Sequence, residues 1–208
     1  MLLSAATFIA SYLIGSLPTA YIVVKRKSDI DIRNAGSGNV GTLNAYEVTG
    51  ARMVGIIVLL VDLFKGALAV FGARVVFGNA SEIISCALIG VVVGHCFPVW
   101  LRFKGGRGLA TAAGAVFIVG WMFVCAWLVC WTVAYLISKN IHFGNIFAIV
   151  AVPILGYLGP ENIIGATIAG GYSVSQFLLV YSLMSAILLI RHVGPLRELI
   201  EAYTKKEH

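Results

Sequence analysis

Long apolar runs dominate the sequence, and they restrict its fold more than any other feature. A helix needs about 20 apolar residues to cross the hydrocarbon core of a bilayer. The runs that approach this length are residues 2–24, 53–77, 83–101, 109–138, 143–158 and 173–190. Only 12% of the 208 residues are charged, whereas soluble domains carry about 25%. The composition therefore predicts an all-α integral membrane protein, with residues 1–208 forming a single polytopic domain.

The distribution of cations indicates how the run at 109–138 folds. As one helix of about 30 residues it would measure about 45 Å, and it would place the basic C-terminal segment outside the cell. If the chain turns back near Gly120-Trp121, the first leg, 109–119, is short and the basic C-terminal segment lies inside the cell. The cations that the turn brings inside are Lys139, Arg191, Arg197, Lys205 and Lys206. The positive-inside bias therefore predicts about seven transmembrane helices, one of them short, with the polar loops and the C-terminus in the cytoplasm.

The first polar loop, residues 25–52, contains the glycine-rich segment "GSGNVG" at 36–41. It matches the dinucleotide fingerprint G-x-G-x-x-G, but that motif requires a strand before it and a helix after it, so we reject this interpretation. Glycines also let successive backbone N–H groups converge on an anion. The alternative is a tight loop packed under the helices. The candidate phosphate ligands of this loop are Arg33, Gly36, Ser37, Gly38, Asn39 and Asn44.

The segment "FKGGRGLAT", residues 103–111, places two cations and three glycines between hydrophobic runs. A helix N-terminus with a flexible glycine entry is a favourable site for an anion. We therefore expect a phosphate to bind there, at the membrane surface. The alternative is a positively charged flank whose glycines serve helix packing. The candidate ligands are Lys104, Gly105, Gly106, Arg107 and Gly108.

Ionisable side chains also occur within or beside the apolar runs. Asp62 and Lys65 are three residues apart, so they can share one face of a helix, and such groups inside a membrane are functional or paired. His95 lies shortly before the second glycine segment, and Pro98 is expected to end the helix there. For Lys65 and His95, a structural pairing and a direct role at the site both remain open. Arg191 and His192 form a further candidate pair at the end of the last run.

Five segments together resemble one known family. They are "GSLPTAY" at 15–21, "DIRNAGSGNVG" at 31–41, "DLFKG" at 62–66, "GHCFPVWLRFKGGRGLAT" at 94–111 and "RH" at 191–192. In this order they resemble the bacterial acyl-phosphate glycerol-3-phosphate acyltransferases, often called PlsY. The resemblance covers nearly the whole chain.

The resemblance implies a function and a location. It implies transfer of a fatty acyl group from acyl phosphate to the 1-position of glycerol-3-phosphate, which gives lysophosphatidic acid for phospholipid synthesis. It implies no metal or other cofactor, a bacterial cytoplasmic (inner) membrane, and a functional link to the enzyme that makes acyl phosphate. Ser37, Lys104, Arg107 and His192 are expected to act in catalysis, and the other candidates above to bind substrate. Because the cations lie at the ends of apolar runs, they suit lipid headgroups and anionic substrates rather than nucleic acid.

Some positions depart from the family pattern. Glu47 stands where the family carries an arginine that holds the acceptor phosphate, and Pro195 stands where it carries an asparagine. One alternative is therefore a divergent paralogue with another acceptor or weak activity. A small membrane transporter or channel is an alternative of another class. Polar residues lining a path to the outer face would favour transport, and the sequence shows none.

The charge distribution predicts an external N-terminus and a cytoplasmic C-terminus. The basic cluster at residues 25–27 follows the first apolar run, as expected for a helix that enters from outside. Single cysteines introduced near each end, in a background without the native cysteines, should react with a membrane-impermeant thiol reagent only at the N-terminus of intact cells. Labelling of the C-terminal cysteine from outside would contradict both the count of seven and the cytoplasmic loops.

Overall fold

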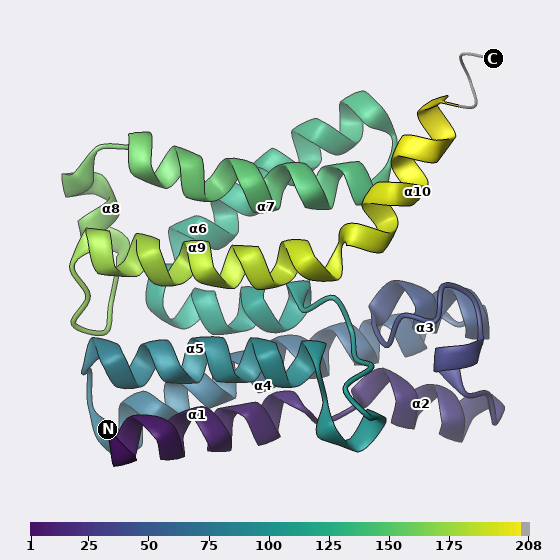
Figure 1. Cartoon of the computed structure of the whole chain (residues 1–208), viewed down its shortest axis with the longest axis horizontal. Coiled ribbons are helices and arrows are strands. Elements are labelled where there is room, and N and C mark those ends of the chain that lie inside the picture. The colour runs from purple at the N-terminus through teal and green to yellow at the C-terminus, as the bar shows by residue number, and fades with distance from the viewer. Residues whose placement is uncertain (205–208) are drawn as a thin grey trace. The chain divides into compact units, whose positions relative to one another are not determined.

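The computed structural model describes residues 1–204, and all regular structure in that range is helical (Figure 1). Six helical segments of the described chain are long and apolar enough to cross a membrane. They are Leu2–Ser28, Arg52–Phe77, Ser81–Leu101, Leu109–Ser138, Ile141–Leu158 and Val174–Arg191. The predicted all-α integral membrane class is confirmed. The count of seven stays a prediction, and Lys205 and Lys206, which entered the charge argument, lie outside the described residues.

The chain divides into two compact units, which we describe separately. Unit 1 is Met1–Ile118, and unit 2 begins at Val119. The assignment of residues 1–208 to a single domain stays a prediction. Unit 1 contains every candidate site residue named above except Arg191 and His192.

The helices of unit 1 pack closely because small residues line their contacts. Helix α1 (Leu2–Gly15) runs along α5 (Ser81–Cys96), and α4 (Arg52–Phe77) packs against both (Figure 1). A Cβ atom on Gly94 of α5 would collide with the carbonyl oxygen of Tyr12 on α1. The absence of side chains at such positions lets two helix backbones approach, which is the usual way that helices associate in a membrane.

The first apolar run does not form the continuous helix that its length predicts over 2–24. Helix α1 ends at Gly15, and α2 (Thr19–Ser28) starts after Pro18. Proline has no backbone N–H, and it disfavours helical geometry in the residue before it. The break leaves the carbonyl oxygen of Leu17 without a helical partner. This oxygen accepts a hydrogen bond of 3.0 Å from Lys65 Nζ.

The segment between α2 and α4 is folded over its own small hydrophobic core. It contains the 3-10 helix η1 (Ile32–Asn34) and helix α3 (Thr42–Thr49), and the 3-10 helix η2 (Val99–Leu101) follows α5. The end of α5 at Cys96 agrees with the expected effect of Pro98. The buried members of this core are Ala20, Val24, Ile32, Val40, Ala45, Val54, Val58 and Leu101. The polar loops are thereby fixed to the ends of α2, α4 and α5.

Helix α6 (Leu109–Ser138) is interrupted at the position predicted for a turn. Gly120 has non-helical dihedrals, φ −162° and ψ 62°, and a Cβ there would lie 2.6 Å from Phe177 Cζ. The carbonyl groups released by the break have partners. Ile118 O accepts from Arg74 Nη1 at 3.0 Å within unit 1, and Val119 O accepts from Ala169 N at 2.8 Å within unit 2.

Unit 2 contains the second leg of α6 and four further helices. Helices α7 and α9 pack side by side, and α10 continues from the end of α9 (Figure 1). Phe123 lies with its ring centroid 4.9 Å from those of Phe177 and Tyr181. The bounds of these helices are α7 (Ile141–Leu158), α8 (Glu161–Thr167), α9 (Val174–Arg191) and α10 (Val193–Thr204).

The contact between α1 and α5 predicts opposite effects for the same substitution at two helical glycines. Gly94→Ala should destabilise the protein by about 1–3 kcal/mol, the usual cost of overpacking. Gly72→Ala on α4 should leave stability unchanged or raise it slightly, because no atom lies within 4 Å of a Cβ at that position. Thermal unfolding in detergent measures both, and equal midpoints for the two variants would contradict the tight α1–α5 contact.

Candidate phosphate-binding site

The first glycine-rich loop exposes its glycine–serine tip while its flanks are buried. Ile32 and Val40 lie in the small core described above, whereas Gly36 and Ser37 are exposed. Gly36 and Gly38 have φ values of +57° and +69°, a left-handed region that glycine adopts without strain. The Ser37 hydroxyl is therefore presented at the surface. The backbone N–H groups of Ser37 and Gly38 instead donate within the loop, to Asn44 Oδ1 and to Ala35 O, contrary to the expectation that they converge on an anion.

Asn44 holds this loop in shape from inside the protein. Its side chain is almost fully buried, and its Nδ2 donates to the carbonyl oxygens of Ala35 and Asn39, at 3.1 and 2.9 Å, and to Ile32 O at 3.3 Å. Its Oδ1 accepts from Ser37 N at 2.9 Å. Because both ends of the amide are used within the loop, Asn44 positions the candidate ligands and is not itself placed to bind substrate.

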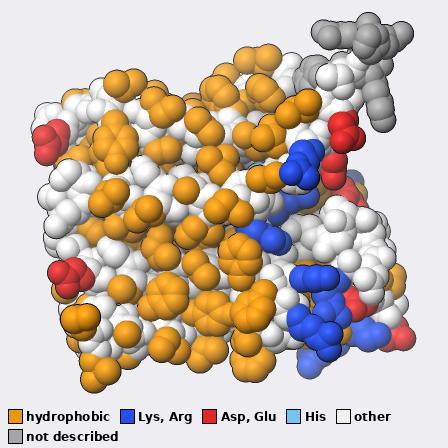
Figure 2. Space-filling model, viewed as in Figure 1, with side chains coloured by type: hydrophobic (Ala, Val, Ile, Leu, Met, Phe, Trp, Pro, Cys, Tyr) orange, Lys and Arg blue, Asp and Glu red, His pale blue; other side chains and the backbone are white. Residues whose placement is uncertain are grey.

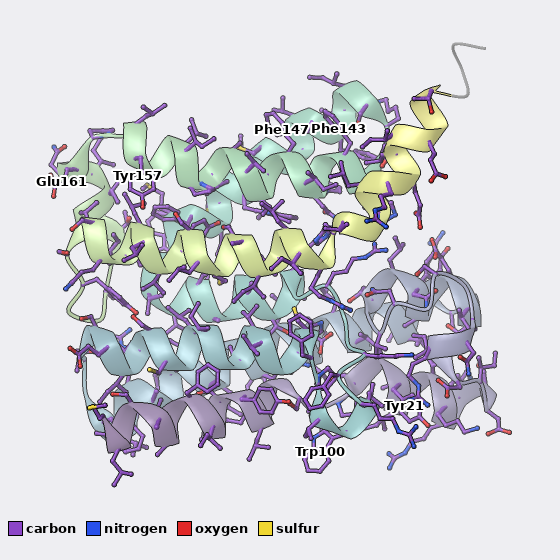
Figure 3. All side chains as sticks on the ribbon, in the orientation of Figure 1. Tyr21, Trp100, Phe143, Phe147, Tyr157 and Glu161 are labelled. Atoms are coloured by element: carbon purple, nitrogen blue, oxygen red, sulfur yellow. The ribbon has the colours of Figure 1, made fainter. Side chains whose placement is uncertain are left out.

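Arg33 is already held by a carboxylate. Its Nε and Nη2 donate to the two carboxylate oxygens of Asp31, at 2.9 and 2.6 Å, and its guanidinium lies 5.2 Å from the ring centroid of Tyr21, labelled in Figure 3. The hydrogen bonds from Arg33 lower the pKa of Asp31 from 3.8 to about 2. The pair therefore stays ionised at neutral and mildly acidic pH, and it is lost only as the pH falls from about 4 towards 2. Arg33 can bind a phosphate only while sharing its charge with Asp31.

The second glycine segment packs on the end of α5. Gly106 N donates to His95 O at 3.1 Å, so this N–H is used inside the protein, contrary to the expectation that it binds phosphate. A Cβ on Gly105 would collide with His95 O, and one on Gly106 would collide with His95 Nε2. Gly108 has a φ of +86° and directly precedes α6. These glycines are required by close packing as well as by any ligand.

Two cations flank these glycines. Lys104 is exposed and Arg107 is half-buried. Further exposed cations on unit 1 lie on α2, at the start of α4 and after η2, and Figure 2 shows basic side chains gathered beside a broad hydrophobic face. They are Lys25, Arg26, Lys27, Arg52 and Arg102. This arrangement attracts a phosphate group to the boundary between the polar loops and the apolar helices.

The two glycine-rich segments meet in space. A Cβ on Gly106 would lie 2.7 Å from Val40 O, and Leu101 shares the small core with Ile32 and Val40. Segments that are about 65 residues apart in the sequence therefore pack against each other. The structure thus brings the end of the first loop, at Val40, against the glycine segment that carries Lys104 and Arg107.

Four other candidate residues lie elsewhere or inside the protein. Lys65 and His95 are buried in unit 1 and interact with Asp62, and the opposite edge of the His95 ring lies against Gly106. His192 is buried in unit 2, with its Nδ1 2.7 Å from Leu188 O, and Arg191 ends α9. The role expected for these two residues of unit 2 stays a prediction.

Sequence reasoning missed two residues near the site. Thr19 and Thr111 are buried, and their hydroxyl groups contact Asp62 and His95 respectively. Their only sequence signal is position: Thr19 follows the helix-breaking Pro18, and Thr111 ends the glycine segment. A threonine in an apolar run is too common to identify such a role.

An all-α chain with membrane-spanning helices and a basic, glycine-rich surface at one end of its N-terminal unit defines a class: integral membrane enzymes that act on phosphate-bearing substrates. Comparison with known proteins is more specific. The family model described as glycerol-3-phosphate acyltransferase matches residues 5–202, and the chain belongs to this family.

Relatives and solved structures agree with this assignment. Glycerol-3-phosphate acyltransferase 2 of Thermotoga maritima is 34% identical over 198 residues, which cover 95% of this chain and 93% of that protein. The glycerol-3-phosphate acyltransferase of Gluconobacter oxydans is 40% identical over 146 residues, covering 70% and 69%. The crystal structure of PlsY, an integral membrane glycerol 3-phosphate acyltransferase, in its glycerol 3-phosphate form aligns with a TM-score of 0.81. It is 28% identical and covers 96% of this chain and 92% of its own.

The hydrogen bonds of Asn44 predict a strong effect of a small substitution. Asn44→Asp replaces the donating nitrogen with an oxygen that faces three carbonyl groups, and each unmade hydrogen bond of a buried group costs about 1–3 kcal/mol. We expect faster limited proteolysis within residues 29–44 and a loss of activity of about tenfold or more. Asn34→Asp, the same change at an exposed position of the same loop, should affect neither. Equal protease resistance of the two variants would show that Asn44 does not hold the loop.

Proposed function

We propose that the protein transfers a fatty acyl group from acyl phosphate to the 1-hydroxyl of glycerol-3-phosphate and so makes lysophosphatidic acid. The single observation that carries the proposal is the contact between the two glycine-rich segments at Val40 and Gly106, which forms one basic surface beside the apolar helices. Both proposed substrates carry a phosphate, and one also carries an acyl chain that remains in lipid. The relatives named above support the choice of acceptor.

The chemistry needs little from the protein beyond positioning and charge. Acyl phosphate is a mixed anhydride, so its carbonyl carbon is already activated. The 1-hydroxyl oxygen attacks that carbon, the bond from the carbon to the phosphate oxygen breaks, and the ester and inorganic phosphate form as the hydroxyl proton is released. Orientation of the two substrates and stabilisation of negative charge supply most of the rate gain in such a reaction. Lys104 and Arg107 supply that charge in this proposal, and Ser37 and the first loop hold a phosphate.

The proposal also covers the remaining candidate residues and the location of the protein in the cell. Arg191 and His192 keep the substrate-binding and catalytic roles that the family resemblance implies, and Gly36, Gly38, Asn39, Gly105 and Gly108 shape the phosphate-binding surface. The protein lies in the bacterial inner membrane with its loops and C-terminus in the cytoplasm, where glycerol-3-phosphate is found. Acyl phosphate reaches it from the enzyme that makes this donor.

A second acceptor is favoured by one observation. Glu47 is exposed on α3 at the position where the family resemblance expects a phosphate-binding arginine, and a carboxylate repels a dianionic phosphate. Purified protein assayed with acyl phosphate and with glycerol-3-phosphate, glycerol or another alcohol as acceptor separates the two cases. Turnover only with uncharged alcohols, together with better use of glycerol-3-phosphate by Glu47→Arg, would replace glycerol-3-phosphate as the acceptor.

The assay also tests the basic surface. Arg107→Ala should lower kcat/KM for acyl phosphate about ten- to a hundredfold, because a hydrogen bond to a charged group contributes about 1.5–3 kcal/mol. Arg197→Ala removes the same side chain from an exposed position of α10, and it should change kcat/KM less than twofold. If a folded Arg107→Ala protein keeps full activity, the glycine segment is a packing element and not a phosphate site.

A further inference from the structure

A buried cluster of polar side chains connects the membrane helices of unit 1 and centres on Asp62. Its Oδ1 lies 2.8 Å from Lys65 Nζ, 3.1 Å from Thr19 Oγ1 and 3.7 Å from His95 Nδ1. Asp62, Lys65, Thr19 and His95 are all more than nine-tenths buried. An ionised carboxylate in such surroundings requires partners, and these four side chains come from α2, α4 and α5.

The ammonium group of Lys65 is bound by groups in the interior of the protein. Its ammonium group binds Asp62 and the carbonyl oxygen of Leu17, and its side chain is only 4% exposed. A lysine held in this way neutralises the carboxylate and donates a hydrogen bond to the carbonyl group released at the break between α1 and α2. This geometry answers the question left open by the sequence in favour of a structural pairing for Lys65.

The two ring nitrogens of His95 lie next to different parts of the protein. The Nδ1 edge of its ring faces Asp62 and lies 3.1 Å from Thr111 Oγ1. The Nε2 edge faces Gly106, since a Cβ on Gly106 would collide with this nitrogen, and the backbone of His95 accepts the Gly106 N–H. One residue therefore joins the buried carboxylate to the glycine segment and, through Thr111, to the start of α6.

We propose that Asp62, together with Thr111, is a positioning residue that orients His95 and thereby holds the glycine segment 105–108 in the geometry that binds phosphate. The inference deepens the proposed function, because it rests on that segment being the phosphate site. A carboxylate beside Nδ1 favours a proton on this nitrogen, which fixes the ring orientation and the Nε2 edge that packs on Gly106. Lys65 acts as the counter-ion of Asp62 and not as a substrate ligand.

Paired substitutions separate positioning from simple ion pairing. Asp62→Asn leaves a buried cation and Lys65→Met leaves a buried anion, so each alone is expected to destabilise the protein strongly. The double variant Asp62→Asn/Lys65→Met contains neither charge, and its unfolding midpoint should return towards that of the wild type. If Asp62 positions His95, kcat/KM of the double variant stays at least tenfold below that of the wild type.

Amide hydrogen exchange gives a readout that does not need activity. In the double variant the Gly106 amide, which donates to His95 O, should exchange at least tenfold faster than in the wild type, while amides in the middle of α4 keep their protection. Faster exchange at Gly106 supports positioning even if the wild type transfers no acyl group. A wild type without acyl transfer would instead refute the proposed function. A folded double variant with wild-type exchange at Gly106 and wild-type kcat/KM would overturn the proposal.

A second variant keeps the test decisive if the double variant does not fold. Thr111→Val is nearly isosteric and removes only the hydroxyl group beside His95 Nδ1. It should speed exchange at Gly106 and raise KM for acyl phosphate, and Thr111→Ser should restore both. Thr7→Val is the matched control, because Thr7 is also buried in a helix of unit 1 but donates to Leu3 O of its own helix. Identical behaviour of Thr111→Val and Thr7→Val would overturn the proposal.

Discussion

Backbone groups that are released where a helix breaks inside an apolar bundle must find partners within the protein, because hydrocarbon offers none. Three helix ends or breaks within residues 1–204 show this, and partners for released carbonyl groups are found at each. Lys65 binds Leu17 O after α1, the Tyr12 hydroxyl binds Phe97 O at 2.8 Å after α5, and Arg74 binds Ile118 O before the break in α6. Three polar residues of the membrane segments, Lys65, Tyr12 and Arg74, are therefore explained by the places where the helices stop.

Two of these breaks create the candidate site. The break at Pro18 separates α2 from α1 and positions Thr19, and the end of α5 at Cys96 starts the turn that leads to the glycine segment. Both are connected to Asp62, the first through Thr19 and the second through His95. A pair of charges in the membrane interior thus fixes two loops that are far apart in sequence.

The sequence was sufficient for the class of fold because apolar runs of membrane-spanning length have few other solutions. It also located the break at Gly120, since charge placement on the two sides of a membrane responds to each reversal of the chain. It did not predict the break at Ser16–Pro18, because the surrounding run carries no charge and a proline can be accommodated within a membrane helix. Nor could spacing alone show that Asn44 points into its own loop or that Arg33 binds Asp31. Such orientations depend on a handful of local hydrogen bonds, which composition and periodicity do not encode.

The pairing of Arg33 with Asp31 suits the proposed role of this loop, in which an anion is bound and released. An arginine without a partner would hold a phosphate dianion strongly, and product release would then be slow. Because the carboxylate remains ionised at physiological pH, it would compete with a bound phosphate for the same guanidinium and weaken the complex. Lys104, which is exposed, would attract a phosphate from a distance without this competition. The proposed reaction consumes two phosphate compounds and yields two more. One restrained cation and one exposed cation would allow specific binding of substrates together with fast release of products.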